Sequence, residues 1–187
     1  MEKEIERCLE ILKAGGTLLY PTDTIWGIGC DATDQAAVEK IFRLKQRTES
    51  KSMIILLDSV EKLAEYVSNI PLIARDLLMN VDKPLTIIYP EGKNLAANLI
   101  ADDGSIAIRI VKNEFCSRLI AAFEKPIVST SANISGDAPP ASFHNIAEEI
   151  KLGVDYVVND DFEEIHEPKP SRIIRLMQNG EFLIIRE

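Results

Sequence analysis

The sequence has few cysteines and lacks the segments that carry a chain across or into a membrane. The three cysteines, Cys8, Cys30 and Cys116, are odd in number and far apart, which argues against a disulfide framework. No apolar run reaches the roughly 18 residues that a membrane-spanning helix needs. The first residues, MEKEIERCLEILKAGG, are charged and amphipathic, unlike a secretory signal. We therefore expect a cytoplasmic protein with no membrane partner.

Positive charge is scarce as well. The chain has 21 Lys and Arg against 30 Asp and Glu, which gives a formal net charge of −9. Proteins that bind nucleic acid over their whole surface are basic, so the composition argues against a nucleic-acid-binding protein of that kind. A local basic pocket for a small molecule that bears phosphate remains compatible with this charge.

The motifs of common catalytic centres are missing. The two histidines, His144 and His166, stand alone, and there is no C-x-x-C or H-E-x-x-H, so we expect no protein-built metal site. The sequence also has no G-x-S-x-G elbow and no Walker P-loop. An enzyme with this sequence would have to work by binding and positioning its substrates.

Helix-like and strand-like segments alternate along the 187 residues, which we interpret as one domain, 1–187. The strand-like run MIILL is apolar throughout, and such strands are usually covered on both faces. This predicts an α/β fold with three layers, in which helices flank a twisted sheet of parallel and antiparallel strands. The predicted helices are 1–14, 33–45, 58–66, 72–79, 114–123 and 142–151, and the predicted strands are 17–20, 53–57, 84–90, 105–111, 125–130, 155–158, 171–176 and 181–187.

The stretch LLYPTDTIWGIGCDA, residues 18–32, places small polar side chains directly after an apolar strand. Thr22, Asp23 and Thr24 offer donors and acceptors at the end of a strand, where open α/β sheets bind their ligands. Gly27 permits a close approach of the backbone. The alternative is a plain loop after a strand, with Trp26 in the core.

Three cations lie between a predicted helix and the strand that follows it. Lys45, Arg47 and Lys51 would suit a polyphosphate, because Arg can bind two phosphate oxygens at once and Lys supplies a mobile point charge. The alternative is that these cations complement the dipole at the carboxyl end of the helix.

Two further polar positions follow or interrupt apolar strands. Ser131 and Asn133 alternate after the strand at 125–130, so both could face one pocket, although Ser and Asn also favour plain turns. Arg109 lies within the apolar run SIAIRIV, where it could bind a carboxylate or phosphate, or could lie on an edge strand that faces water.

These motifs occur together in the order and rough spacing of one family. The motifs are YPTDTIWGIGCDA, the K-x-R of LKQR, KPLTIIYP, IAIRIV and the S-x-N of TSANISG. With them the chain resembles the YrdC-like threonylcarbamoyl-AMP synthases from about Leu12 to the last strand. The resemblance implies a single YrdC-like domain with a deep, positively lined cavity. It also implies a nucleotidyltransferase that condenses ATP, L-threonine and bicarbonate into threonylcarbamoyl-AMP and releases pyrophosphate.

The resemblance assigns roles to residues that match the family's motifs. It implies that Lys45 and Arg47 are the catalytic clamp on the triphosphate, with Lys51 in support. It implies that Ser131 and Asn133 contact ATP, and that Thr22, Arg109 and Ser171 contact threonine. Departures from the family pattern occur at Ser52, Arg172 and Arg175.

The resemblance also implies a cofactor and partners. Mg²⁺ would be held mainly by the phosphates of ATP and by water. The product would feed a downstream transferase that makes threonylcarbamoyladenosine in tRNA, and direct contact between tRNA and this chain is left open. A paralogue that binds nucleotide or RNA without catalysis is the alternative function.

Overall fold

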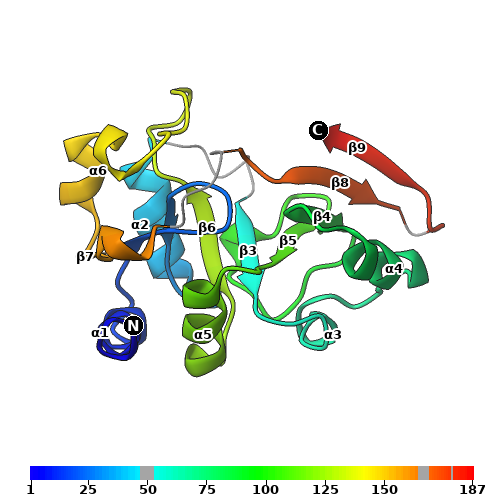
Figure 1. The fold of residues 1–187 in the computed structure, drawn as a ribbon. Helices are drawn as coiled ribbons and strands as arrows, with labels where there is room; N and C mark the ends of the chain where they lie inside the picture. Colours follow the sequence, from blue (N-terminus) through cyan, green and yellow to red (C-terminus); the bar gives the residue numbers. More distant parts are fainter. Residues whose placement is uncertain (47–52, 164–168, 178) are drawn as a thin grey trace.

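The computed structural model describes residues 1–46, 53–163, 169–177 and 179–187. Its strands form one open, strongly twisted sheet in the order β7-β1-β2-β6-β3-β5-β4-β8-β9 (Figure 1). Neighbours pair in parallel for β1–β7, β3–β5 and β4–β8, and antiparallel elsewhere, which confirms the predicted mixed sheet. The strands are β1 (Leu18–Tyr20), β2 (Gly27–Gly29), β3 (Ile54–Leu57), β4 (Leu85–Tyr89), β5 (Ile106–Ile110), β6 (Ile127–Ser131), β7 (Tyr156–Val157), β8 (Arg172–Leu176) and β9 (Phe182–Arg186).

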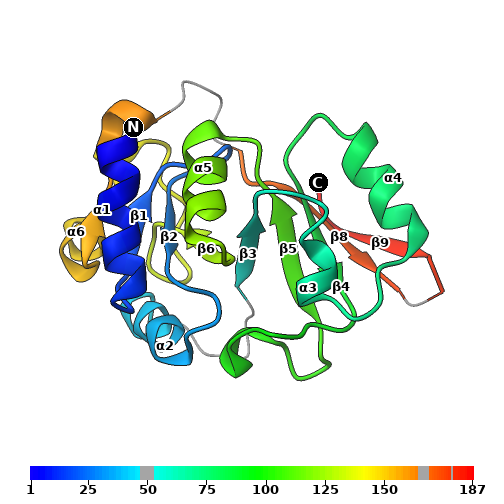
Figure 2. The ribbon, with the colours of Figure 1, turned by 90° about the horizontal axis from the view of Figure 1, so that it is seen from below.

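Helices cover both faces of the sheet, so the predicted three-layer α/β class is confirmed. They are α1 (Glu2–Lys13), α2 (Gln35–Leu44), α3 (Leu63–Tyr66), α4 (Leu72–Asn80), α5 (Glu114–Phe123) and α6 (Glu148–Gly153), with 3₁₀ turns η1 (Ala97–Leu99), η2 (Phe143–Asn145) and η3 (Asp160–Phe162). Helices α1 and α5 lie side by side in front of the sheet in Figure 2. Alternate residues of β1 separate the two cores, because Leu18 packs with α1 and α5 whereas Leu19 packs with α2.

Local signals account for the start of α2 and the end of α1. Asp34 caps α2 by accepting hydrogen bonds from the backbone N–H groups of Ala36 and Ala37. Gly15, with φ at +70°, follows the end of α1 in the left-handed conformation that glycine adopts without strain.

The predicted start of the third helix is wrong. The sequence predicts a helix over 58–66, in which Asp58 and Glu61 have the spacing of a capping box, but α3 begins at Leu63. The carboxylate of Asp58 instead accepts a hydrogen bond from the Lys62 ammonium at 2.9 Å. This side-chain pair occupies the group that the capping box would have needed for the backbone.

One face of the sheet changes character along its strands. Leu56 on β3 and Ile127 on β6 are register partners and pack in the core beneath α5. Two and four residues beyond Ile127, the same face of β6 carries Ser129 and Ser131, while Arg109 on β5 is the register partner of Leu56. The polar part of this face, beyond α5, is where the candidate site lies.

Two expectations about the whole chain have different outcomes. No helix in the described ranges is long and apolar enough to span a membrane. The organisation of 1–187 as a single domain stays a prediction.

Candidate functional site

A pocket of about 210 Å³ opens on the polar part of the sheet. Its walls come from the turn after β1, from β2, β3, β5 and β6, and from the start of β8 together with the adjacent end of β9. Its polar lining includes Thr24, Arg109, Ser129, Thr130, Ser131, Ser171 and Arg186. Two guanidinium groups and a row of hydroxyls suit an anionic, hydroxyl-bearing ligand.

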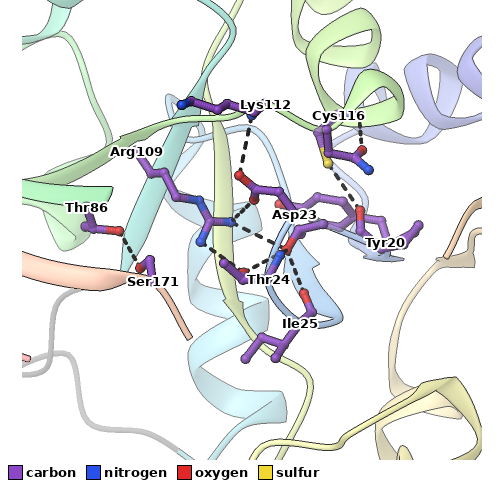
Figure 3. A network of polar contacts seen from close by, with 12 residues as sticks. Tyr20, Asp23, Thr24, Ile25, Thr86, Arg109, Lys112, Cys116 and Ser171 are labelled. Atoms are coloured by element: carbon purple, nitrogen blue, oxygen red, sulfur yellow. Dashed lines mark hydrogen bonds and ion pairs between the residues drawn. The ribbon is translucent and has the colours of Figure 1, made fainter. Parts of the chain in front are cut away.

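The residues after β1 form an ordered chain of hydrogen bonds (Figure 3). Arg109 donates to the hydroxyl of Thr24 at 3.0 Å, and that hydroxyl lies 3.0 Å from the hydroxyl of Thr22. The Thr22 hydroxyl itself donates to the carbonyl of Ile25 at 2.7 Å, so the Thr24 hydroxyl is the donor in the Thr24–Thr22 bond. Of the two threonines, it is Thr24 that lines the pocket in the described part of the chain. Thr22, the predicted threonine contact, shapes the turn that presents Thr24.

Arg109 is a buried cation with a carboxylate partner. Strand β5 lies between β3 and β4, so the edge-strand alternative for Arg109 is wrong. Its guanidinium is 3.1 Å from the carboxylate of Asp23, and the two side chains are only 4% and 8% exposed. The pairing of Asp23 with Arg109 was not predicted from the sequence, although a buried arginine requires a partner of opposite charge. The pair fixes the guanidinium at the pocket wall.

Ser171, directly before β8, and Arg186 of β9 form the part of the wall contributed by the β8–β9 pair. The Ser171 hydroxyl lies 2.7 Å from the hydroxyl of Thr86. The backbone carbonyl of Ser171 accepts hydrogen bonds from Nε and Nη2 of Arg186 at 3.0 and 2.8 Å. Partial burial lowers the pKa of Arg186, and the positive charge of Arg109 lowers it further. Two cations that repel each other at one pocket are both stabilised by a bound anion. Arg186 was missed in the sequence, where the signal was a lone cation in the apolar run FLIIRE.

Ser131 lines the pocket, Asn133 is not among the described lining residues, and the contact of Asn133 with ATP stays a prediction. Ser131 is the register partner of Gly27, where an added Cβ would lie 3.2 Å from Oγ of Ser129. Asn133 turns into its own loop and donates to the carbonyls of Ile134 and Asp137 at 2.8 and 2.9 Å. Strand β6 ends at Ser131, so the strand alternation does not continue to Asn133.

Lys45 connects the K-x-R and S-x-N motifs. It follows α2, is 1% exposed, and its ammonium donates to the backbone carbonyls of Ser131 and Asn133. Its role as a phosphate ligand stays a prediction. Arg47 and Lys51, the other two predicted clamp residues, lie outside the described residues.

Comparisons with known proteins identify relatives along nearly the whole chain. Residues 10–187 match the family model described as Sua5_yciO_yrdC, telomere recombination. The chain is 38% identical to the threonylcarbamoyl-AMP synthase of Psychromonas ingrahamii over 138 residues, 72% of each protein. It is 30% identical to that of Hahella chejuensis over 169 residues, 90% of this chain and 92% of the relative.

Solved structures share the fold. The crystal structure of P. abyssi Sua5 complexed with L-threonine has a TM-score of 0.82 and 28% identity, covering 94% of this chain. This chain spans only about half of that protein, 52% of its length. E. coli YciO has a TM-score of 0.86 at 24% identity and shows the fold alone. The chain thus belongs to the Sua5/YciO/YrdC family.

Proposed function

We propose that this protein is an L-threonylcarbamoyladenylate synthase, which condenses ATP, L-threonine and bicarbonate into threonylcarbamoyl-AMP and pyrophosphate. The observation that carries the proposal is the pocket in which Arg109 and Arg186 face a row of hydroxyls. All three substrates are anionic or carry an anionic group, and this wall offers cations and neutral donors. Relatives that cover most of the chain are named as this synthase, which supports the same activity here.

We place threonine on the Arg109 side of the pocket. Arg109 and Ser171 both line the pocket and offer donors to a carboxylate, and Thr22 would act through Thr24. ATP would lie toward Ser131, with Arg186, Arg47 and Lys51 as cations for its phosphates. The threonine complex of P. abyssi Sua5 supports an amino-acid site in this fold.

The chemistry needs positioning more than a nucleophilic side chain. The amine of threonine and bicarbonate form a carbamate with loss of water. A carbamate oxygen then attacks the α-phosphorus of ATP, the α–β phosphoanhydride bond breaks, and pyrophosphate leaves. Carbamates decompose readily in water, so a pocket that encloses this intermediate favours the reaction. Cations near the phosphates offset the charge that builds on the leaving pyrophosphate.

Magnesium belongs to the same proposal. Mg²⁺ prefers hard oxygen ligands and retains several waters, so we expect the phosphates of ATP and water to supply most of its ligands. The hydroxyls of Thr24, Ser129 and Ser131 are oxygen donors on the pocket wall that suit such an ion. When bound, Mg²⁺ would neutralise phosphate charge.

We also propose a cytoplasmic location for the protein, and we propose that a separate tRNA-modifying transferase uses the product.

The test is pyrophosphate release by purified protein with ATP, threonine, bicarbonate and magnesium, with each component omitted in turn. We expect release to require both threonine and bicarbonate, and mass spectrometry to detect threonylcarbamoyl-AMP. Release that continues without threonine would contradict the proposal. Nucleotide binding without any product would instead indicate the non-catalytic paralogue.

A further inference from the structure

Trp26, the only tryptophan of the chain, lies directly before β2, is 2% exposed and lines the pocket. Its contacts join three segments that are far apart in the sequence. Its indole N–H donates to the carboxylate of Glu163 at 2.7 Å, and its carbonyl accepts a hydrogen bond from the N–H of Ala132 at 3.0 Å. Its ring packs on that of Phe143, with the ring centroids 4.9 Å apart. One residue of the pocket lining is therefore a junction between the segments after β6, in η2 and after η3.

Two of these contacts flank one loop. We call residues 133–142, which lie between β6 and η2, the rim loop. Ala132 directly precedes the rim loop and Phe143 directly follows it, so Trp26 contacts the chain at both of its ends. Within the rim loop, Pro139 is exposed and lines the pocket. The first half of the loop has a further contact, because the N–H of Ser135 donates to the carbonyl of the residue that follows α2. The second half, which carries Pro139, returns to the fold at Phe143.

The hydrogen bond to Glu163 sets the orientation of the indole. An indole N–H is a donor only, and when it is buried it needs an acceptor. A hydrogen bond to a carboxylate is directional and roughly twice as strong as one between neutral groups. The packing against Phe143 fixes the orientation less, because burial of apolar surface is non-directional. Without the carboxylate, we expect the ring to turn toward another acceptor and its contact with Phe143 to change.

We infer that Glu163 is a positioning residue of the pocket. Its carboxylate holds the indole of Trp26, and Trp26 holds the rim loop so that Pro139 lines the pocket. Ser131, which lies on the side proposed for ATP, directly precedes the residue that bonds to the Trp26 carbonyl, so the same junction influences nucleotide binding. The consequence for ATP rests on the proposed function, whereas the consequences for the indole and the rim loop do not.

Fluorescence of Trp26 tests the first step, because no other tryptophan contributes. Glu163→Ala removes the acceptor of the indole N–H. We expect a shifted emission maximum and an acrylamide quenching constant about twofold higher or more, because a ring that is free to turn opens to solvent more often. Glu163→Gln should return both values toward those of the wild type, since its amide oxygen can still accept. Wild-type fluorescence in Glu163→Ala would overturn the inference.

Hydrogen exchange tests the second step. The N–H of Ala132 donates to Trp26 at 3.0 Å, and the N–H of Ile146 donates to the carbonyl of Phe143 at 3.1 Å. In Glu163→Ala we expect both to exchange about tenfold faster, because loss of a hydrogen bond to a charged group favours local opening by that order. Trp26→Phe keeps a ring but has no N–H, so adding Glu163→Ala to it should change the exchange no further. Wild-type exchange in Glu163→Ala, or additive effects of the two substitutions, would overturn the inference.

The matched control is Glu4→Ala. The carboxylate of Glu4, on α1, also accepts two hydrogen bonds, from the Tyr156 hydroxyl and the Asn159 N–H at 3.0 Å each. These partners lie in the segment that leads to Glu163, but the described contacts of Glu4 do not include Trp26. We expect wild-type fluorescence and wild-type exchange around the rim loop. Changes as large as those of Glu163→Ala would mean that loosening of this segment, rather than loss of the indole contact, moves the rim loop, and would overturn the inference.

Nucleotide affinity tests the consequence for the pocket. Calorimetry should show that Glu163→Ala weakens AMP and ATP by a similar factor, several-fold or more, because a displaced wall affects the part that the two nucleotides share. Glu163→Gln should restore both affinities. If Glu163 acted through its charge, its removal would instead favour ATP over AMP, and Glu163→Gln would behave like Glu163→Ala. That result, or unchanged affinities in Glu163→Ala, would overturn the inference. Failure of the wild type to bind either nucleotide would contradict the proposed function, while fluorescence and exchange would still decide the role of Glu163.

Discussion

The two arginines of the pocket are held in different ways. Arg109 is paired with the carboxylate of Asp23 and is almost completely buried, so its charge is compensated before any ligand binds. Arg186 lies at the exposed end of β9, and its described hydrogen bonds go to the neutral oxygens of Ser171. The comparison indicates that Arg109 contributes a fixed geometry to the site, whereas Arg186 contributes charge that is available to an anionic substrate.

The largest expected effect is on the buried pair. Asp23→Asn removes the charge that compensates Arg109 and leaves a guanidinium that is 4% exposed without its counter-ion. Breaking such a pair from one side destabilises a protein by about 3–5 kcal/mol. Urea unfolding measures the loss. Replacing both partners, Asp23→Asn with Arg109→Met, should recover much of the lost free energy of unfolding. If Asp23→Asn alone were as stable as the wild type, the pair would not contribute to stability.

Arg186 should affect function more than folding. Arg186→Gln removes a cation whose partners are neutral, so we expect a small change in the free energy of unfolding. Loss of a charge-assisted contact to substrate amounts to about 1.5–3 kcal/mol, or about 10- to 150-fold in kcat/KM for ATP. Arg118→Gln, an exposed arginine on α5 that pairs with Glu2, is the matched control and should leave kcat/KM unchanged. Equal values in Arg186→Gln and the control would remove Arg186 from the site.

A smaller effect should separate the two residues of S-x-N. Ser131→Ala removes a pocket hydroxyl and should lower turnover by about tenfold, since ~1.4 kcal/mol corresponds to that factor, with little change in melting temperature. Asn133→Ala removes two hydrogen bonds within the loop and should lower stability by about 1–2 kcal/mol. Turnover and melting temperature, measured on both variants, check whether Ser131 acts in the pocket and Asn133 in the loop. An unchanged melting temperature in Asn133→Ala would contradict the loop role.

Much of the fold was predictable because its signals are local. The capped helix after Asp34, the apolar strand at β3 and the glycine after α1 each depend on neighbours within a few residues. The start of α3 was predicted wrongly, and the cause is also local, because Asp58 has a competing partner nearby in Lys62.

The site was predictable in composition but not in its contacts. The motifs around Thr22, Arg109 and Ser131 do gather near one pocket. The contacts of Arg109 with Asp23 and Thr24 join positions more than eighty residues apart, and nothing in local pattern selects those partners. Likewise, the expectation that Asn133 and Ser131 face one pocket requires strand alternation past Ser131, where β6 ends.

The smallest effect comes from a surface counterpart of the Asp23–Arg109 pair. Asp103 accepts a hydrogen bond from Arg175 at 2.7 Å, but the two side chains are 53% and 39% exposed. The pKa of Asp103 is lowered to about 2, first by a hydrogen bond from the Ser105 side chain and then by Arg175. Because the folded-state pKa is depressed, the stabilisation is fully present above the unfolded value near 4 and is lost as the pH falls toward 2.

Solvent screens an exposed pair, so we expect it to contribute less than about 1 kcal/mol, well below the buried pair. The measurement is the difference in unfolding free energy between the wild type and Asp103→Asn from pH 5 to pH 2. That difference should be constant at the upper end and shrink toward zero at the lower end. Arg175→Gln should raise the pKa of Asp103 only in part, because the hydrogen bond from Ser105 remains. A difference as large as that of Asp23→Asn would mean that burial is not what separates the two pairs.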